Sequence, residues 1–298
     1  MITIQNEKIR LQVAEHGAEL SSIQAGGREY LWQADPKFWN RHSPVLFPQV
    51  GMVWNKEYRH RGQVYPMGQH GFARDMDFVL HSEERGEAFF LLESSAETLA
   101  RYPFPFRLEI GYRLHDNCID VLWIVKNTGA EEMLYQIGAH PAFLYRDLDV
   151  SLKERGFLYL YRDGKATEEL TYISPTEKGC TDCVAHTLSL PGGEMEITTD
   201  TFACDTYIFE GHQLSKITLA DRHRRPYLSI AFNTPLVAVW SPSATKPDVP
   251  FICLEPWYGR CDRVGYEGEL CDRDHMQHLQ PGAIFSTSYT ITLEDLPK

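Results

Sequence analysis

The chain has 298 residues, of which 43% are hydrophobic and 23% charged, as in a folded globular protein and unlike a disordered or collagen-like one. Its 29 basic and 41 acidic residues give a net charge of -12, which disfavours nucleic acid as a partner because the phosphate backbone is also negative. No apolar run reaches the roughly 18 residues of a membrane helix, and the first residues lack the apolar stretch of a signal peptide. We therefore predict a cytoplasmic protein with no membrane partner.

Alternation of apolar and polar residues is the dominant pattern along the chain, and it predicts β-strands with one buried face. The clearest example is a pair of runs at residues 107–114 and 119–126, separated by turn-forming residues, which predicts a hairpin. Further strands are predicted at residues 2–4, 9–14, 88–93, 195–198, 207–209, 227–231, 237–240, 251–254 and 286–293.

Helical periodicity is scarce, and only residues 36–40 and 96–101 are expected to form single turns or short helices. Many short strands without strand–helix alternation predict an all-β fold, a large antiparallel β-sandwich. The chain has no internal repeat and no flexible linker, and the loop-like residues 242–250 join two predicted strands. We therefore expect residues 1–298 to form a single domain.

Two segments place a reactive side chain directly before a proline, namely His140 before Pro141 and Glu255 before Pro256. A following proline disfavours the helical conformation, so both side chains should project from stiff, extended backbone at the end of a strand. Their neighbours are apolar, which should raise the pKa of the Glu255 carboxyl toward the range of a general base. The alternative for each residue alone is a buried, hydrogen-bonded histidine and an ion-paired glutamate.

Two further segments also concentrate polar groups among glycines and aromatic residues. His70 precedes Gly71, and Arg74 offers a rigid donor fork for an oxygen-rich ligand. Asp205 precedes a predicted strand and either accepts hydrogen bonds from ligand hydroxyls or caps a turn. Flat apolar faces for a sugar ring are available from Trp257, Trp240 and Tyr258, although such residues are more often core.

A metal centre is the less favoured interpretation. Cys180 and Cys183 have the spacing of half a zinc site, but no second close cysteine pair follows, although Cys261, Cys271 and His275 lie further on.

A triad of two histidines and one carboxylate, His70, His140 and Glu255, is a second metal option without a local signature. The seven cysteines are too scattered for a disulfide framework, and no phosphate-binding glycine loop is present. We predict neither a metal nor a cofactor.

Five motifs occur in a characteristic order along the chain: WQADP at residues 32–36, PVLFP at 44–48, HGFAR at 70–74, HPAF at 140–143 and EPWYG at 255–259. Together they resemble the aldose 1-epimerase (galactose mutarotase-like) family, in particular its LacX-like branch. The resemblance spans nearly the whole chain. It implies a large antiparallel β-sandwich and a cofactor-independent isomerase that interconverts the α and β anomers of an aldose.

The resemblance also implies roles for individual residues. Glu255 would be the general base on the anomeric hydroxyl and His140 the general acid on the ring oxygen, a role that suits histidine because its pKa is ordinarily near neutrality. His70 would lie near the same oxygen, Asp205 would hold sugar hydroxyls, and Arg74 would bind the ligand. Trp257 is the expected aromatic partner of the sugar.

Several alternatives remain open at this point. Galactose mutarotases carry an arginine and an asparagine before the first histidine, and residues 44–51 of this chain have neither, so the sugar is not specified. A hexose-6-phosphate 1-epimerase would use cationic groups such as Arg74 and Arg41. A non-catalytic sugar-binding or sugar-sensing protein would bind without turnover, and a glycoside hydrolase would use Glu255 and Asp205 as paired carboxylates. The protein is expected to be a monomer or a homodimer.

Overall fold

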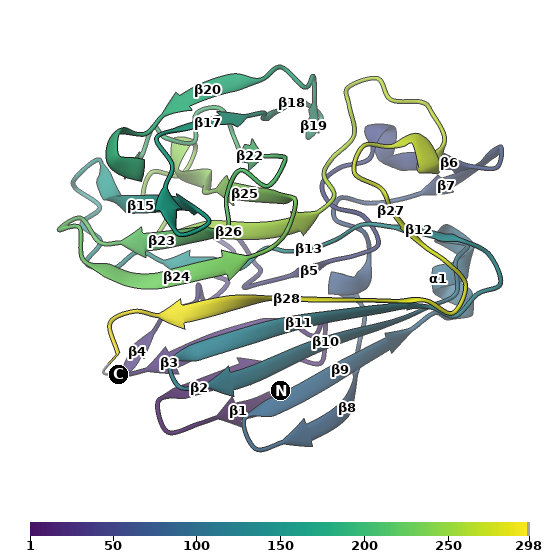
Figure 1. Ribbon diagram of the computed structural model, residues 1–298, viewed down its shortest axis with the longest axis horizontal. Helices are drawn as coiled ribbons and strands as arrows, with labels where there is room; N and C mark the ends of the chain where they lie inside the picture. Colours follow the sequence, from purple (N-terminus) through teal and green to yellow (C-terminus); the bar gives the residue numbers. More distant parts are fainter. Residues whose placement is uncertain (297–298) are drawn as a thin grey trace.

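The protein is described by a computed structural model that covers residues 1–296, and antiparallel sheets dominate it (Figure 1). The largest sheet has ten strands. In spatial order they are β16 (Lys165–Ala166), β15 (Glu154–Arg162), β23 (Lys216–Ala220), β24 (Pro226–Phe232), β28 (Ile284–Leu293), β11 (Cys118–Asn127), β10 (Phe106–His115), β9 (Glu87–Glu93) and β8 (Val79–Glu84), with β21 (Glu194–Thr198) also paired to β15.

A second sheet of six strands lies above β28 and β11 in the view of Figure 1. Its order is β22 (Tyr207–Phe209), β25 (Leu236–Trp240), β26 (Phe251–Tyr258), β13 (Ile137–Ala139) and β5 (Val45–Leu46), and β14 (Ala142–Leu144) also pairs with β26. Strand β26 therefore lies in the middle of this sheet, between β25 on one side and β13 and β14 on the other.

Smaller sheets and short helices complete the fold. A four-stranded sheet contains β1 (Ile2–Gln5), β2 (Ile9–Val13), β3 (Leu20–Ala25) and β4 (Arg28–Glu29). Two-stranded sheets pair β6 (Glu57–His60) with β7 (Gln63–Pro66), β12 (Met133–Tyr135) with β27 (Gln277–Leu279), β17 (Glu169–Tyr172) with β20 (His186–Ser189), and β18 (Pro175–Glu177) with β19 (Cys180–Thr181). The helices are α1 (Ala96–Arg101) and the short 3₁₀ turns η1 (Trp54–Lys56), η2 (Ala73–Asp75), η3 (Pro191–Gly193), η4 (Pro242–Ala244) and η5 (Leu270–Asp272).

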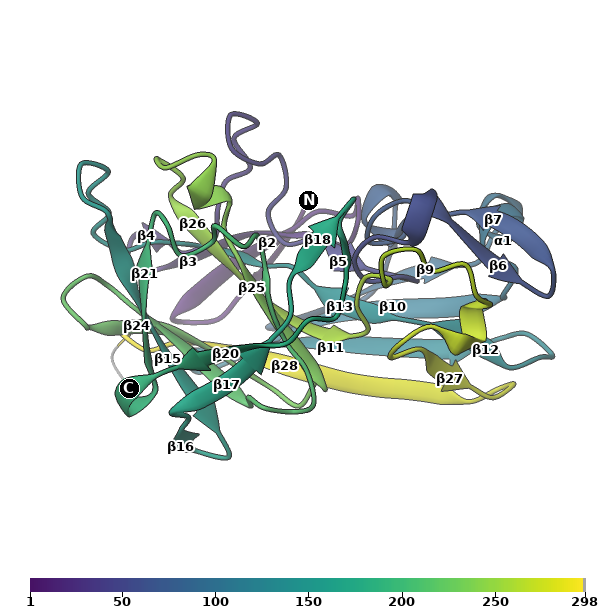
Figure 2. The same cartoon turned by 90° about the horizontal axis from the view of Figure 1, so that it is seen from above.

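The predicted hairpin is present as β10 and β11, joined by a two-residue turn after the His115–Cys118 pair. Along β11 the side chains alternate strictly between buried and partly exposed, as the sequence pattern requires of a strand with one core-facing side. The inward side chains, including the fully buried Trp123, contribute to the main hydrophobic core. Seen from above, the β17–β20 and β6–β7 pairs lie over opposite ends of the molecule (Figure 2).

The β-sandwich prediction is confirmed, and every predicted strand is present with ends that differ by a few residues. Residues 96–101 form the predicted helix α1, with Ser95 as its N-cap, whereas residues 36–40 contain a turn and no helix. None of the helices in residues 1–296 has the length and apolar character of a membrane span. The single domain and the cytoplasmic location stay predictions.

Candidate active site

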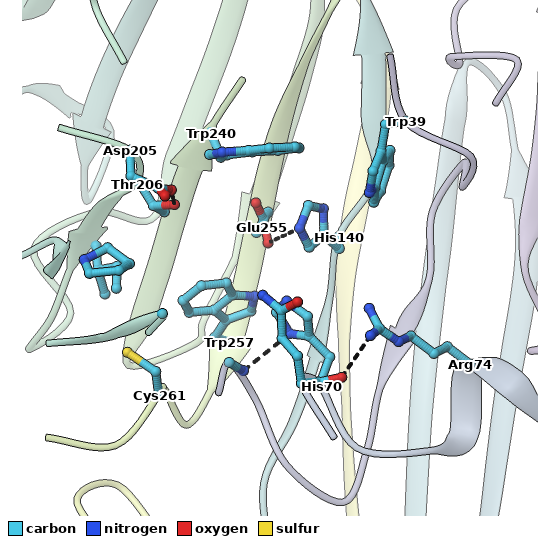
Figure 3. Close-up of a pocket in the computed structure, with 15 residues that line it drawn as sticks. Trp39, His70, Arg74, His140, Asp205, Thr206, Trp240, Glu255, Trp257 and Cys261 are labelled. Atoms are coloured by element: carbon cyan, nitrogen blue, oxygen red, sulfur yellow. Dashed lines mark hydrogen bonds and ion pairs between the residues drawn. The ribbon is translucent and has the colours of Figure 1, made fainter. Parts of the chain in front are cut away.

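A cavity of about 300 Å³ opens on the six-stranded sheet (Figure 3), which is within the size range of small-molecule sites. All six residues predicted from the sequence as site residues line this cavity: Glu255, His140, His70, Arg74, Asp205 and Trp257. They come from four separate segments of the chain, so the fold brings together residues that are up to 187 positions apart (257 minus 70).

Glu255 lies inside the central strand β26, where its backbone pairs with Ala238 of β25. The prediction that it ends a strand is therefore wrong: Pro256 restricts the backbone to extended geometry but does not stop the strand, which runs on to Tyr258. The residue is only 1% exposed. A carboxyl group is thus held on rigid sheet backbone at the floor of the cavity.

His140 follows directly after β13, as predicted, and its side chain faces Glu255 (Figure 3). Its Nε2 lies 3.3 Å from Oε2 of Glu255. The imidazole stacks on Trp39 with ring centres 4.9 Å apart and meets the edge of Trp240 at 5.7 Å. These two aromatic walls fix the ring orientation, and neither Nδ1 of His140 nor Oε2 of Glu255 has a hydrogen-bond partner among the described residues.

Burial shifts the pKa values of Glu255 and His140 in opposite directions, because a low-dielectric environment disfavours the charged form of each side chain. Burial, together with the negative charge of Asp205, raises the pKa of Glu255 well above its ordinary value. Burial, together with the positive charge of Arg74, lowers the pKa of His140 to about 3. The expectation that His140 titrates near neutrality is therefore wrong, because burial favours the neutral imidazole and, at Glu255, the protonated carboxyl.

His70 lies in a tight turn with φ of 63°, next to Gly71. A Cβ atom at Gly71 would lie 2.2 Å from the Phe47 carbonyl oxygen, so the turn requires glycine there. The Gly51 N–H donates to His70 Nδ1 at 3.1 Å. Nδ1 is thus an acceptor, and the neutral ring carries its proton on Nε2. Burial lowers the pKa of His70 well below its usual range, which maintains this neutral form.

Arg74 belongs to η2 at the cavity wall, where its Nη2 donates to the Gln69 carbonyl oxygen at 2.7 Å. Its buried Nε has no hydrogen-bond partner among the described residues. Burial and the nearby charge of Arg41 lower the pKa of Arg74 to about 10. The guanidinium therefore keeps unused donor capacity beside the cavity.

Asp205 lines the cavity opposite His140, and Trp257 lies beside His70 in Figure 3. Asp205 has φ of 74° and accepts a hydrogen bond from Thr206 Oγ1 at 2.7 Å. The Trp257 indole N–H donates to the Ala139 carbonyl oxygen at 3.2 Å. Because that donor is occupied, Trp257 offers the cavity its apolar ring.

The sequence missed Trp39, which directly follows the turn at residues 36–38, in a segment that was expected to form a single turn or a short helix and carried no periodic signal. Trp240 lines the cavity as suggested. Tyr258 does not: its hydroxyl donates to the Asn233 carbonyl oxygen, and its ring packs against Phe285.

The two metal options considered from the sequence do not assemble. Within residues 1–296, the cluster of potential metal ligands contains His140, Cys253 and Glu255, and it includes neither His70 nor the Cys180–Cys183 pair. His70 Nδ1 is already engaged by the Gly51 N–H, which removes one of its two possible ligand atoms.

An antiparallel β-sandwich with a carboxyl and an imidazole facing each other in one cavity defines a protein suited to acid–base chemistry on a small ligand. Residues 1–271 match the model of the family described as aldose 1-epimerase. The chain therefore belongs to the aldose 1-epimerase family, which supports a mutarotase-like, isomerase-type function with a sugar substrate.

Relatives agree with this assignment over nearly their full lengths. The plasmid and chromosomal LacX proteins of Lactococcus lactis subsp. lactis are each 29% identical over 98% of this chain and 99% of their own. A galactose mutarotase related enzyme from Lactobacillus acidophilus is 30% identical with a TM-score of 0.89, covering 99% of this chain and 97% of that one. A galactose mutarotase-like protein from Lactobacillus casei is 30% identical with a TM-score of 0.88, covering 99% and 100%.

Proposed function

We propose that this protein interconverts the α and β anomers of an aldose by acid–base opening and closing of the sugar ring. The observation that carries the proposal is the buried pair of His140 Nε2 and Glu255 Oε2, 3.3 Å apart at the cavity wall. Ring opening removes the proton of the anomeric hydroxyl and adds one to the ring oxygen. A base and an acid on one rigid scaffold perform both transfers, and each positioned group contributes roughly 10²–10⁴-fold.

Proton balance explains why the pair works as a unit. Opening consumes an ionised Glu255 and a protonated His140, and it leaves a protonated Glu255 and a neutral His140. Both arrangements carry one proton, so they differ by moving that proton over the 3.3 Å between the two groups. Rotation about the C1–C2 bond of the open sugar exposes the other carbonyl face. Closure then runs the transfers backward and gives the other anomer.

The remaining site residues position the sugar in this proposal. His70 is a neutral donor through Nε2, suited to a hydrogen bond with the ring oxygen as charge develops there. Asp205 accepts hydrogen bonds from hydroxyls, and the Trp257 ring packs against the apolar face of the sugar. Arg74 binds an oxygen-rich substituent at the wall of the cavity.

The substitution Glu255→Gln tests the catalytic claim, because glutamine keeps the shape of the side chain but cannot accept the proton. Polarimetry of freshly dissolved α-glucose and α-galactose should show a kcat reduced by roughly 10²–10⁴-fold. Calorimetric binding of the equilibrated sugar should persist. Glu196→Gln, at an exposed position of β21, is the matched control with wild-type rates. Sugar binding by a wild-type protein that accelerates no mutarotation would instead establish the non-catalytic alternative.

A hexose 6-phosphate is a second candidate substrate, favoured by the buried Arg74 Nε, which makes no hydrogen bond in the described residues and only a 3.8 Å ion-pair contact with Asp75 Oδ2. If the phosphate binds there, Arg74→Lys should raise KM for glucose 6-phosphate more than KM for glucose, because lysine loses the bidentate fork. Equal changes in both KM values would contradict a phosphate role for Arg74.

A further inference from the structure

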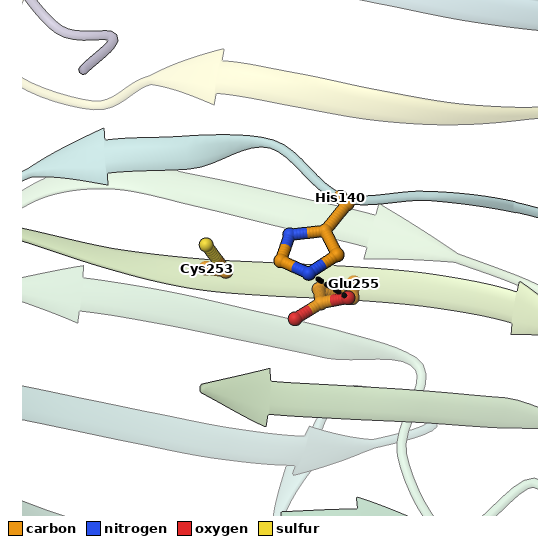
Figure 4. Close-up of side chains that lie close together, drawn as sticks. All are labelled: His140, Cys253 and Glu255. Carbon is orange, nitrogen blue, oxygen red and sulfur yellow. Dashed lines mark ion pairs between the residues drawn. The ribbon is translucent and has the colours of Figure 1, made fainter. Parts of the chain in front are cut away.

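A third reactive side chain lies against the proposed catalytic pair. Cys253 and Glu255 are two positions apart on β26, so both side chains project from the same face of the strand. The thiol sulfur, an imidazole nitrogen of His140 and a carboxylate oxygen of Glu255 all lie within 4.8 Å of one another (Figure 4). Acid–base catalysis by His140 and Glu255 gives the thiol no task.

The three groups are deeply buried: exposure is 0% for Cys253, 1% for Glu255 and 8% for His140. Nδ1 of His140 has no hydrogen-bond partner in the described residues, and Oε2 of Glu255 has only the 3.3 Å ion-pair contact with His140 Nε2. Buried polar atoms normally have partners, and a bound ion is one of the explanations for those that lack them.

The spacing suits a tetrahedral ion. Zinc lies ~2.0–2.1 Å from histidine nitrogen and ~2.0–2.2 Å from carboxylate oxygen, so these two ligands of one ion are about 3.3 Å apart. The His140–Glu255 separation is also 3.3 Å. The sulfur lies within 4.8 Å of the other two ligand atoms, so it needs to approach by up to roughly an ångström to reach its Zn–S distance of about 2.3 Å.

We propose that Cys253, His140 and Glu255 form a binding site for Zn²⁺ or a similar borderline-soft divalent cation, which competes with the sugar. Sulfur, nitrogen and oxygen ligands together are typical of zinc rather than of magnesium or calcium. His140 and Glu255 line the cavity, so the ion enters from that side and keeps a fourth position open to water. Binding releases the thiol proton and the carboxyl proton to solvent.

The consequence for catalysis rests on the proposed function, whereas the binding itself does not. A cation on Glu255 and His140 occupies the lone pairs that move protons in ring opening. Metal binding should therefore abolish mutarotation, and a chelator should restore it. The ion is an inhibitor in this scheme and no part of the reaction.

Cobalt(II) tests the binding directly, since a cobalt–thiolate bond gives a charge-transfer absorption band in the near ultraviolet. Full-length protein stripped with EDTA is titrated with CoCl₂ and, in a calorimeter, with ZnCl₂. We expect one ion per chain with the thiolate band. Cys253→Ser and Cys253→Ala should lose the band, and their zinc affinity should be at least about tenfold weaker, since even residues outside the ligand set change affinity by 10–100-fold.

Cys271→Ser is the control, because Cys271 is exposed and does not belong to the three-residue cluster. It should keep both the band and the affinity. Absence of a thiolate band in the wild type, or a band that survives in both folded Cys253 variants, would overturn the site. Circular dichroism verifies that each variant is folded. These readouts need no turnover, so a chain that binds zinc but accelerates no mutarotation would contradict only the proposed function.

Discussion

Strand β11 of the ten-stranded sheet buries every second side chain, whereas β26 of the six-stranded sheet buries seven consecutive residues from Phe251 to Trp257. The first strand has one core-facing side and one outward side. The second is covered on both faces from Phe251 to Trp257, and of these residues Glu255 and Trp257 line the cavity. A carboxyl group on such a strand loses its hydration, which is why burial raises the pKa of Glu255. The six-stranded sheet thus both positions the Glu255 carboxyl and raises its pKa.

The largest losses in the free energy of unfolding are expected when neighbouring residues on β26 are substituted. Phe251 and Ile252 are both fully buried but belong to different hydrophobic clusters on opposite faces. Phe251→Ala should lower the free energy of unfolding by about 3–5 kcal/mol and Ile252→Ala by about 2–5 kcal/mol. Urea denaturation measures both. A small effect at either position would show that one face of β26 is not packed.

On β11, by contrast, substitutions of two neighbouring residues should lower the free energy of unfolding by different amounts. Trp123 is fully buried, whereas Leu122 is only partly so. Trp123→Ala should cost about 3–5 kcal/mol, and Leu122→Ala below about 1 kcal/mol. The same denaturation experiment checks this pair. Equal losses of stability at Trp123 and Leu122 would show that β11, like β26, is packed on both faces.

The remaining expected effect concerns pH. The pKa of His140 is about 3 in the folded protein and 6.5 ordinarily, so the unfolded chain takes up a proton that the folded one refuses. The stability associated with neutral His140 is fully present above pH 6.5 and is lost as pH falls toward 3. The free energy of unfolding should therefore fall more steeply over that window in the wild type than in His140→Gln. Parallel curves from urea denaturation at pH 7, 5.5 and 4 would show that burial does not disfavour the charged ring.

The extent to which the sequence predicted the fold follows from the same contrast. Alternation located β10 and β11 to within a residue or two, because one face of each is solvated. In β26 no alternation exists, and the rule that proline restricts its predecessor was wrongly extended to a strand end at Glu255. Alternation of apolar and polar residues locates the ends of strands that are solvated on one face. It does not locate the ends of strands that are buried on both faces.

The sequence identified residues of the candidate site but not the contacts between them. Motifs named the residues that line the cavity, yet no pattern within a few residues could place Trp39 on the His140 ring. The tautomer of His70 depends on Gly51, 19 positions earlier. Such features depend on contacts between segments that are distant in the sequence, and local sequence patterns do not predict these contacts.

The position of β26 between β25 and β13 has a consequence for synthesis of the protein. A nascent chain that has left the ribosome only as far as residue 250 already contains His140 but still lacks the strand that pairs with β13 and β14. The middle of the sheet is filled late, by a segment translated more than a hundred residues after β13 and β14. Amino-terminal fragments that end before Phe251 therefore lack Glu255 and cannot complete the candidate site.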